Sequence, residues 1–142
     1  MKYAKRLLVL LLLIMPVLSA AQMPANTTIV AQVPFEFMAG NKYIPAGECV
    51  VQSMPNGAGD AVVIRNIAES VSVFSAALPV ETRQPSSNFV LKFHEYGGRY
   101  FLAGIELAGH RMMYRLPESK AEQELRAQNV SATDKTLLAV RK

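Results

Sequence analysis

The sequence contains no tryptophan, one cysteine and two histidines among its 142 residues. A lone cysteine, Cys49, cannot form an internal disulfide, so the fold must be stabilised by its apolar core. In an oxidising compartment this thiol is either buried and inert or a point of cross-linking between two chains. The neighbouring Val50 and Val51 favour the buried state.

The scarcity of histidine and cysteine also argues against a metal centre. A zinc site needs three or four converging ligands. His94 and Glu95 alternate along a strand and should face opposite sides, Glu106 is expected on the core side, and His110 lies further along the chain. The sequence therefore predicts no metal ion and no cofactor.

Motifs for common catalytic chemistry are missing as well. The sequence has no Gly-x-Ser-x-Gly elbow, no phosphate-binding loop and no dinucleotide fingerprint. Cys49 has no evident base beside it in the sequence. We therefore expect no enzymatic activity, with a secreted hydrolase as the least favoured alternative.

Long apolar runs are confined to the N-terminus, where residues 7–18 follow three basic residues within the first six. Small residues come next and end at Ala21, so the layout is that of a secretory signal peptide over 1–21. Cleavage before Gln22 is the expected site, with cleavage after Ala20 as the near alternative. The run is too short for a membrane anchor, which needs about 20 apolar residues, and no cysteine follows that could carry a lipid.

An excess of positive charge is missing once this segment is removed. The signal segment holds three of the 15 basic residues and none of the 11 acidic ones, which leaves twelve basic and eleven acidic residues in the mature chain. A nucleic-acid partner would call for a basic stripe, so none is expected. We expect an exported protein, periplasmic or extracellular, with no membrane span after cleavage.

The mature chain is predicted to be one domain. Residues 22–32 lack a clear period and are interpreted as a flexible leader, and residues 33–142 as a β-rich domain. Alternating apolar residues bounded by turn residues predict strands over 33–38, 48–54, 61–66, 70–78, 112–116 and 136–141, with a polar connection over 79–87. With the hairpin described next, this predicts an all-β fold, a single antiparallel sandwich or small barrel of about seven or eight strands.

The clearest local pattern is a hairpin over 88–107. Gly97 and Gly98 suit a two-residue turn with positive φ at both positions, which sets Tyr96 opposite Arg99 and His94 opposite Phe101. One face should then enter the core. The other face combines aromatic and basic side chains, and we take it as the candidate binding surface, composed of Lys92, His94, Tyr96, Arg99 and Phe101, with Val90 and Ile105 beside them.

One short helix is predicted over 119–127. Ser119 followed by Glu122 forms a capping box, and Ala121 and Leu125 share a face. A helix this short is marginal alone, so it should pack on the sheet. If this helix or another strand covers the mixed hairpin face, Phe101 and Ile105 are ordinary packing residues.

Three blocks of sequence resemble a group of small secreted bacterial proteins. The predicted β-rich domain begins with Val-Pro-Phe-Glu-Phe at 33–37 and Ile-Pro-Ala-Gly at 44–47, similar to the "PF-x-F … LPAG-x-Y" opening of that group. Residues 93–102 and 116–122 resemble its second and third blocks. The resemblance implies an exported β-rich domain and supplies no site residue. Cys49 departs from it, because the group usually has tyrosine there.

Together these features predict an exported, non-catalytic structural or binding module of the cell envelope or extracellular space. Its expected partner is an envelope protein or a polysaccharide. The alternative is a small-ligand or carbohydrate binder that uses the 88–107 hairpin face. Self-association through an exposed edge strand is a further way to assemble.

Overall fold

The computed structural model describes residues 27–56 and 59–142. The predicted signal peptide, its cleavage site and residues 22–26 lie outside this range. The described chain forms strands β1 (Thr28–Val33), β2 (Phe37–Ala39), β3 (Lys42–Ile44), β4 (Gly47–Asn56), β5 (Gly59–Asn66), β6 (Val71–Glu81), β7 (Phe89–Tyr96), β8 (Arg99–Glu106), β9 (Met112–Arg115) and β10 (Thr133–Arg141), and helix α2 (Lys120–Ala127).

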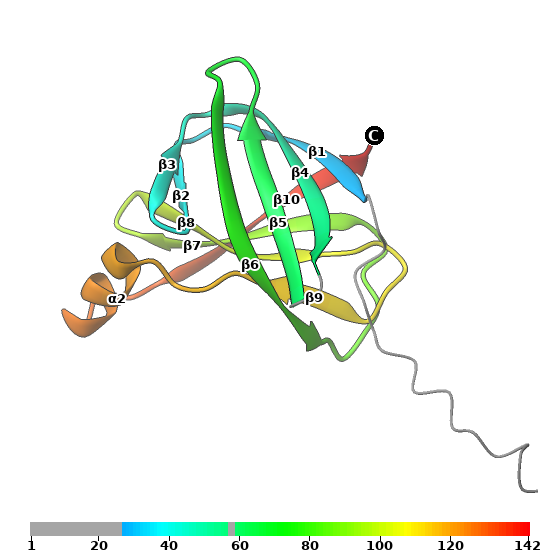
Figure 1. The fold of residues 1–142 in the computed structure, drawn as a ribbon. Helices are drawn as coiled ribbons and strands as arrows, with labels where there is room; N and C mark the ends of the chain where they lie inside the picture. Colours follow the sequence, from blue (N-terminus) through cyan, green and yellow to red (C-terminus); the bar gives the residue numbers. More distant parts are fainter. Residues whose placement is uncertain (1–26, 57–58) are drawn as a thin grey trace, which may run out of the picture.

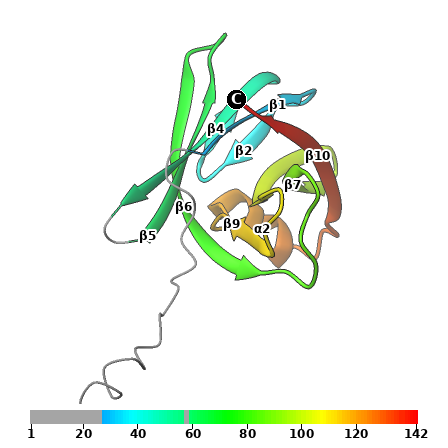
Figure 2. The same ribbon diagram turned by 90° about the vertical axis from the view of Figure 1, so that its right-hand side faces the viewer.

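Eight of the strands close into an antiparallel barrel (Figure 1). The order around it is β8-β7-β10-β1-β4-β5-β6-β9, and β9 pairs again with β8. Figure 2 shows β4, β5 and β6 on one side and β7, β9 and β10 on the other. The all-β prediction is confirmed, and between the two architectures left open the fold is a barrel. The short strands β2 and β3 extend the sheet beside the turn end of β8, where β2 runs parallel to β8.

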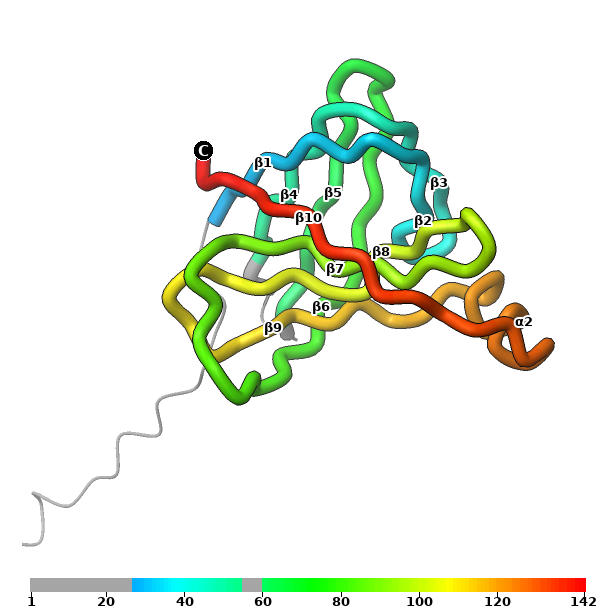
Figure 3. Tube along the Cα trace, turned by 180° about the vertical axis from the view of Figure 1, so that it is seen from behind, coloured from blue at the N-terminus to red at the C-terminus, as the bar shows by residue number. Residues whose placement is uncertain are grey.

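The first strand lies where a flexible leader was expected. Residues 28–32 belong to β1, which pairs with β4 on one side and β10 on the other. Ile29, Ala31 and Val33 point inward and are almost fully buried. The apolar residues therefore do alternate with a period of two, but the small Ala31 weakens the pattern. That part of the leader prediction was wrong, because the first strand of the described residues begins at Thr28. Figure 3 shows β10 running between β1 and β7.

The inside of the barrel is packed with side chains. An eight-stranded barrel has an interior just wide enough for side chains to fill. The inward-facing residues form one buried cluster, comprising Ile29, Ala31, Val33, Phe37, Ala39, Ile44, Cys49, Val51, Val62, Ile64, Val73, Ala77, Leu91, Phe93, Leu102, Ile105, Leu107, Tyr114, Leu116 and Ala139. The expected burial of Cys49 is confirmed. Burial, and secondarily the charge of Glu48, raises the pKa of its thiol to about 11.

A buried amide holds the turn between β3 and β4. The Asn66 side chain, 1 % exposed, donates to the carbonyl oxygens of Pro45 and Ala46 at 3.0 and 3.3 Å. Gly47 follows at φ 139°, and a Cβ there would lie 3.3 Å from the Asn66 nitrogen. The Pro-Ala-Gly sequence thus forms a turn whose carbonyl oxygens accept hydrogen bonds from the Asn66 side chain of β5.

The predicted hairpin register is confirmed near its turn and changes further away. Tyr96 pairs with Arg99 and His94 with Phe101, but between Lys92 and Phe93 the register shifts, with Ala103 as the extra residue. A β-bulge of this kind reverses which face later residues occupy. Ile105 is therefore in the core and Glu106 outside, so the predicted placement of both was wrong.

Two strand boundaries also differ from the prediction. The alternating segment 33–38 is divided between the end of β1 and the three-residue β2. Strand β6 continues to Glu81, into the segment expected to be a polar connection, because Leu78–Glu81 pair with β9. This pairing is part of the closure of the barrel, which local patterning does not predict.

Helix α2 packs on the outside of the hairpin. The Ser119 side chain accepts a hydrogen bond from the Glu122 backbone N–H at 3.1 Å, as predicted for the cap. Ala121 and Leu125 contact a second buried cluster of Met38, Tyr96 and Phe101. Within the described residues, no helix has the length and hydropathy that a bilayer span requires.

Candidate functional site

The helix covers the aromatic part of the predicted binding face. Tyr96 and Phe101 are 3 % and 2 % exposed, and their rings meet edge to face at 5.7 Å. Arg99 remains exposed, donates to the Tyr43 hydroxyl at 3.1 Å and lies 5.6 Å from the Phe101 ring centre. The five predicted residues therefore do not form one open surface. At Tyr96 and Phe101 the structure agrees with the alternative prediction, in which the helix packs on the hairpin face.

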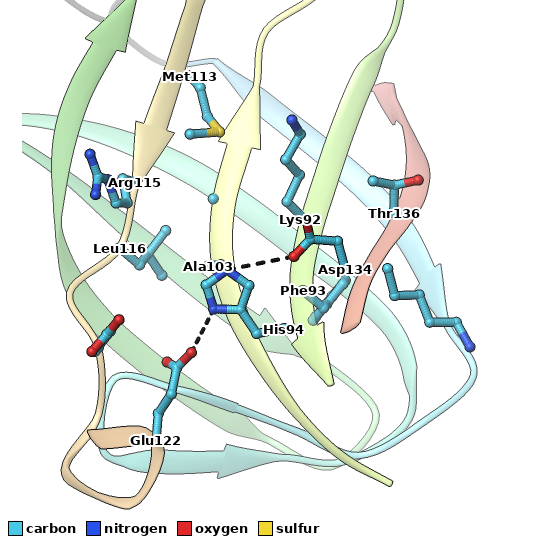
Figure 4. Close-up of a pocket in the computed structure, with 13 residues that line it drawn as sticks. Lys92, Phe93, His94, Ala103, Met113, Arg115, Leu116, Glu122, Asp134 and Thr136 are labelled. Carbon is cyan, nitrogen blue, oxygen red and sulfur yellow. Dashed lines mark hydrogen bonds and ion pairs between the residues drawn. The ribbon is translucent and has the colours of Figure 1, made fainter. Parts of the chain in front are cut away.

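The other two predicted residues, Lys92 and His94, line a groove on the outer wall of the barrel (Figure 4). Its volume is about 370 Å³, within the range of roughly 300–1,000 Å³ typical of ligand pockets. Strands β7, β8, β9 and β10 and helix α2 all contribute to it. The lining residues are Lys92, Phe93, His94, Ala103, Gly104, Met113, Arg115, Leu116, Glu118, Glu122, Asp134, Lys135 and Thr136.

The groove exists because small residues occupy its floor. Outward-facing positions of adjacent strands align in the row Thr136–Lys92–Gly104–Arg115. Gly104 contributes no side chain to this row, and Ala103 beside it contributes a methyl group. The Met113 side chain folds over Gly104, where an added Cβ would lie only 3.1 Å from the sulfur. Space thus remains between Arg115 and Met113 on one side and Lys92 and Thr136 on the other (Figure 4).

A hydrogen-bonded carboxylate closes one end of the groove. Glu122 is 3 % exposed, and its Oε1 lies 2.6 Å from His94 Nδ1 and accepts from the Tyr96 hydroxyl at 3.2 Å. His94 Nε2 lies 3.9 Å from an Asp134 carboxylate oxygen. The imidazole thus stands between two carboxylates, as Figure 4 shows. Burial, together with Glu122, raises the pKa of Tyr96 to about 12.

Most charged groups in and beside the groove are paired. Lys92 Nζ lies 2.5 Å from Glu106, and Glu118 pairs with Arg126 of the helix. Arg115 differs from these residues. Its side chain is exposed and has no ion-pair partner within residues 27–56 and 59–142.

No protein-family model, curated protein or solved structure matches this chain. What the groove does must therefore be inferred from its own residues. In the described part of the chain, no group of three or more His, Cys, Asp or Glu side chains could hold a metal ion. The ion-pair partners of His94 are both carboxylates, and neither is a nucleophile that the imidazole would activate in a Ser–His or Cys–His manner.

The sequence pattern of the hairpin indicated Lys92 and His94 but not the other residues of the groove. Asp134 and Thr136 belong to the outer face of a strand whose partner, β7, could not be read from the sequence. Gly104 and Arg115 become neighbours only through the bulge at Ala103 and the pairing of β8 with β9. The capping box did mark Glu122, but as a cap residue. Its carboxylate instead reaches across to the hairpin.

Proposed function

We propose that this protein is an exported, non-catalytic binding module of the cell envelope or extracellular space, and that its binding site is the outer groove. The observation that carries the proposal is the contrast between a filled barrel and a hollowed outer wall. The interior is occupied by core side chains, so a ligand has room outside, where Lys92, His94 and Arg115 surround a floor of small residues.

The proposal favours a small-ligand or carbohydrate binder over the other modes considered. Sugar stacking on the hairpin aromatics is disfavoured because Tyr96 and Phe101 lie beneath the helix. The proposal does not rest on strand pairing, and the sheet order ends at the three-residue β3. There the Lys42 ammonium donates to the Ser72 carbonyl at 3.1 Å, which places a charge at the edge.

Export is supported by the sequence of residues 1–21. The non-catalytic role is proposed because the sequence lacks the motifs of common catalytic chemistry. An envelope polysaccharide or the exposed part of an envelope protein fits the location that the signal peptide predicts.

The test compares two substitutions on the outer face of β10. Thr136 lines the groove, whereas Leu138, two residues further, is exposed outside it. The full gene is expressed in a bacterial host, the protein is purified from the exported fraction, and its retention on immobilised envelope polysaccharide is measured. Thr136→Tyr should weaken retention roughly tenfold or more by occupying the groove, and Leu138→Tyr should leave it unchanged.

Equal retention of Thr136→Tyr and the unchanged protein, with both folded by circular dichroism, would refute the groove as the binding site. Recovery of the protein only from the cytoplasm, with its N-terminal segment intact, would refute export.

A further inference from the structure

We infer that the groove binds a ligand through a carboxylate, which the Arg115 guanidinium holds while the rest of the ligand lies over Ala103 toward His94. This inference rests on the proposed function, because it names the ligand chemistry of the same groove. It assigns a binding role to Arg115.

The guanidinium of Arg115 has hydrogen-bonding capacity that the described residues of the protein do not use. A guanidinium presents five N–H donors in a planar fork that matches a carboxylate, and such pairs are commonly bidentate. The other cations at the groove are less able to serve. Lys92 is paired with Glu106 at 2.5 Å, and the Lys135 ammonium lies 5.1 Å from the Phe35 ring centre and 5.3 Å from that of Tyr100, so it stacks on aromatic rings. Among the lysine and arginine residues that line the groove, Arg115 is the one whose side-chain N–H donors are free to bind a ligand.

A second feature is the space beside Arg115. Its neighbour across the sheet on β8 is Gly104, which has no side chain of its own and is covered by Met113, so the open space beside Arg115 lies over Ala103. Lys92 follows one strand further, about 10 Å from Arg115 along the sheet by two strand spacings. The space over Ala103, between Arg115 and His94, can accept a planar carboxylate with part of a ring or a peptide unit. Leu116 and the methyl of Ala103 supply an apolar surface beneath it.

A third feature is the opposite end, where the charges are negative. Asp134 has a side chain 88 % exposed, and the carboxylates of Glu118 and Glu122 lie near the helix start. These carboxylates repel a second anion, and the exposed Asp134 carboxylate can accept a hydrogen bond from a hydroxyl or amide N–H donor. The complementary ligand therefore has one carboxylate at the Arg115 end and neutral donors at the His94 end.

Two sources share this chemistry. A uronic acid carries a carboxylate and ring hydroxyls, and the C-terminus of an acylated peptide carries a carboxylate and an amide N–H. The experiment is a titration of the purified protein followed by amide chemical shifts in NMR, with D-galacturonate and N-acetylalanine as probes. Galactose and N-acetylalaninamide are their uncharged counterparts.

Saturable shifts at Ala103, Gly104 and Arg115 are expected with at least one acidic probe, and binding at least roughly tenfold weaker with its uncharged counterpart. Binding of galacturonate alone would identify the ligand as a sugar acid, and binding of N-acetylalanine alone would identify it as a peptide C-terminus. Binding of both would indicate a general carboxylate site. Each of these outcomes supports the inference. Equal binding of an acid and its uncharged counterpart, or no shift with any probe, would overturn it.

Arg115→Gln supplies the residue-level test, with Arg65→Gln as its matched control. Arg65 is also an exposed, outward-facing strand arginine, on β5 and outside the groove. Arg115→Gln should weaken binding of the acidic probe roughly tenfold or more, while Arg65→Gln should not change it. A similar loss in both variants would show a diffuse charge effect and refute the Arg115 site. Retention on envelope polysaccharide that needs an open groove but not Arg115 would overturn the carboxylate inference and leave the proposed function standing.

Discussion

The two ends of the β7–β8 hairpin present different outer surfaces although they share the same strands. Near the turn, Tyr96 and Phe101 are buried beneath α2. Away from the turn, Lys92 and Gly104 face an open groove. Both ends alternate in the same way along the chain, so alternation alone does not distinguish them. The covered end owes its burial to the helix, and the open end owes its shape to the bulge and to a missing side chain.

This difference predicts that residues of the covered end stabilise the fold and that residues of the open end bind the ligand. Substitutions at the covered end should lower the free energy of unfolding by amounts typical of a core. Substitutions at the open end should change ligand affinity with little effect on folding.

The largest effect is expected for Phe101→Ala. The ring is 2 % exposed and packs on Tyr96 and Met38, and removing a buried phenylalanine side chain costs about 3–5 kcal/mol. Lys92→Ala, in the open end, removes only a surface ion pair and should cost less than about 1 kcal/mol. Urea denaturation of both variants measures the contrast, and comparable losses would show that the two ends are energetically equivalent.

A smaller effect is expected for Glu122→Gln, which alters the contact between the helix and the hairpin. The buried carboxylate loses its charge-assisted contact with His94, and such losses cost about 1–3 kcal/mol. Glu118→Gln is the control, because its side chain is 32 % exposed and its pair with Arg126 should contribute less than about 1 kcal/mol. Hydrogen exchange of the amides in 120–127 should accelerate in Glu122→Gln and stay unchanged in Glu118→Gln. Unchanged exchange in both would mean that apolar packing alone holds the helix.

The last effect concerns the covered end and is measured by alkaline titration. The pKa of Tyr96 rises from 10.0 to about 12, so the folded state favours its neutral form. Its stabilising contribution is complete below pH 10 and is lost as the pH rises from 10 toward 12. The free energy of unfolding should therefore fall less steeply over this range in Tyr96→Phe than in the unchanged protein.

Cys49 and Tyr114 titrate at high pH in both proteins, with pKa values raised to about 11 and about 12, so they cancel in the comparison. Parallel pH profiles for Tyr96→Phe and the unchanged protein would show that the covered end does not titrate with folding.

Local features of the fold were predictable from the sequence, and the features that shape the groove were not. The Gly97–Gly98 turn fixed the hairpin register near Tyr96, and Ser119 located the helix start, because both depend on backbone chemistry within a few residues. The bulge at Ala103 has no such local signature, since a single extra residue among apolar neighbours leaves the pattern nearly unchanged.

Long-range pairing limited the prediction of the site itself. Arg115 and Gly104 meet only because β9 pairs with both β6 and β8, and Asp134 and Thr136 arrive through the pairing of β10 with β7. Lys92 and His94 were recognised because they belong to the hairpin. Tyr96 and Phe101 were open to either interpretation, and the docking of Ala121 and Leu125 determined that they are buried.

The position of β10 between β1 and β7 has a consequence for how the chain folds. Thr133–Arg141 joins the first described strand to one more than fifty residues away in the chain, so the ring of strands is incomplete until this segment takes its place. Before that moment, β7 exposes a row of backbone N–H and C=O groups without the partners that β10 supplies, and so do Ile29 and Val30 of β1. Such groups can pair with another chain. Pairing between segments so distant in the chain is typical of slow folding. The interval before β10 docks is therefore when the chain is most exposed to misassembly.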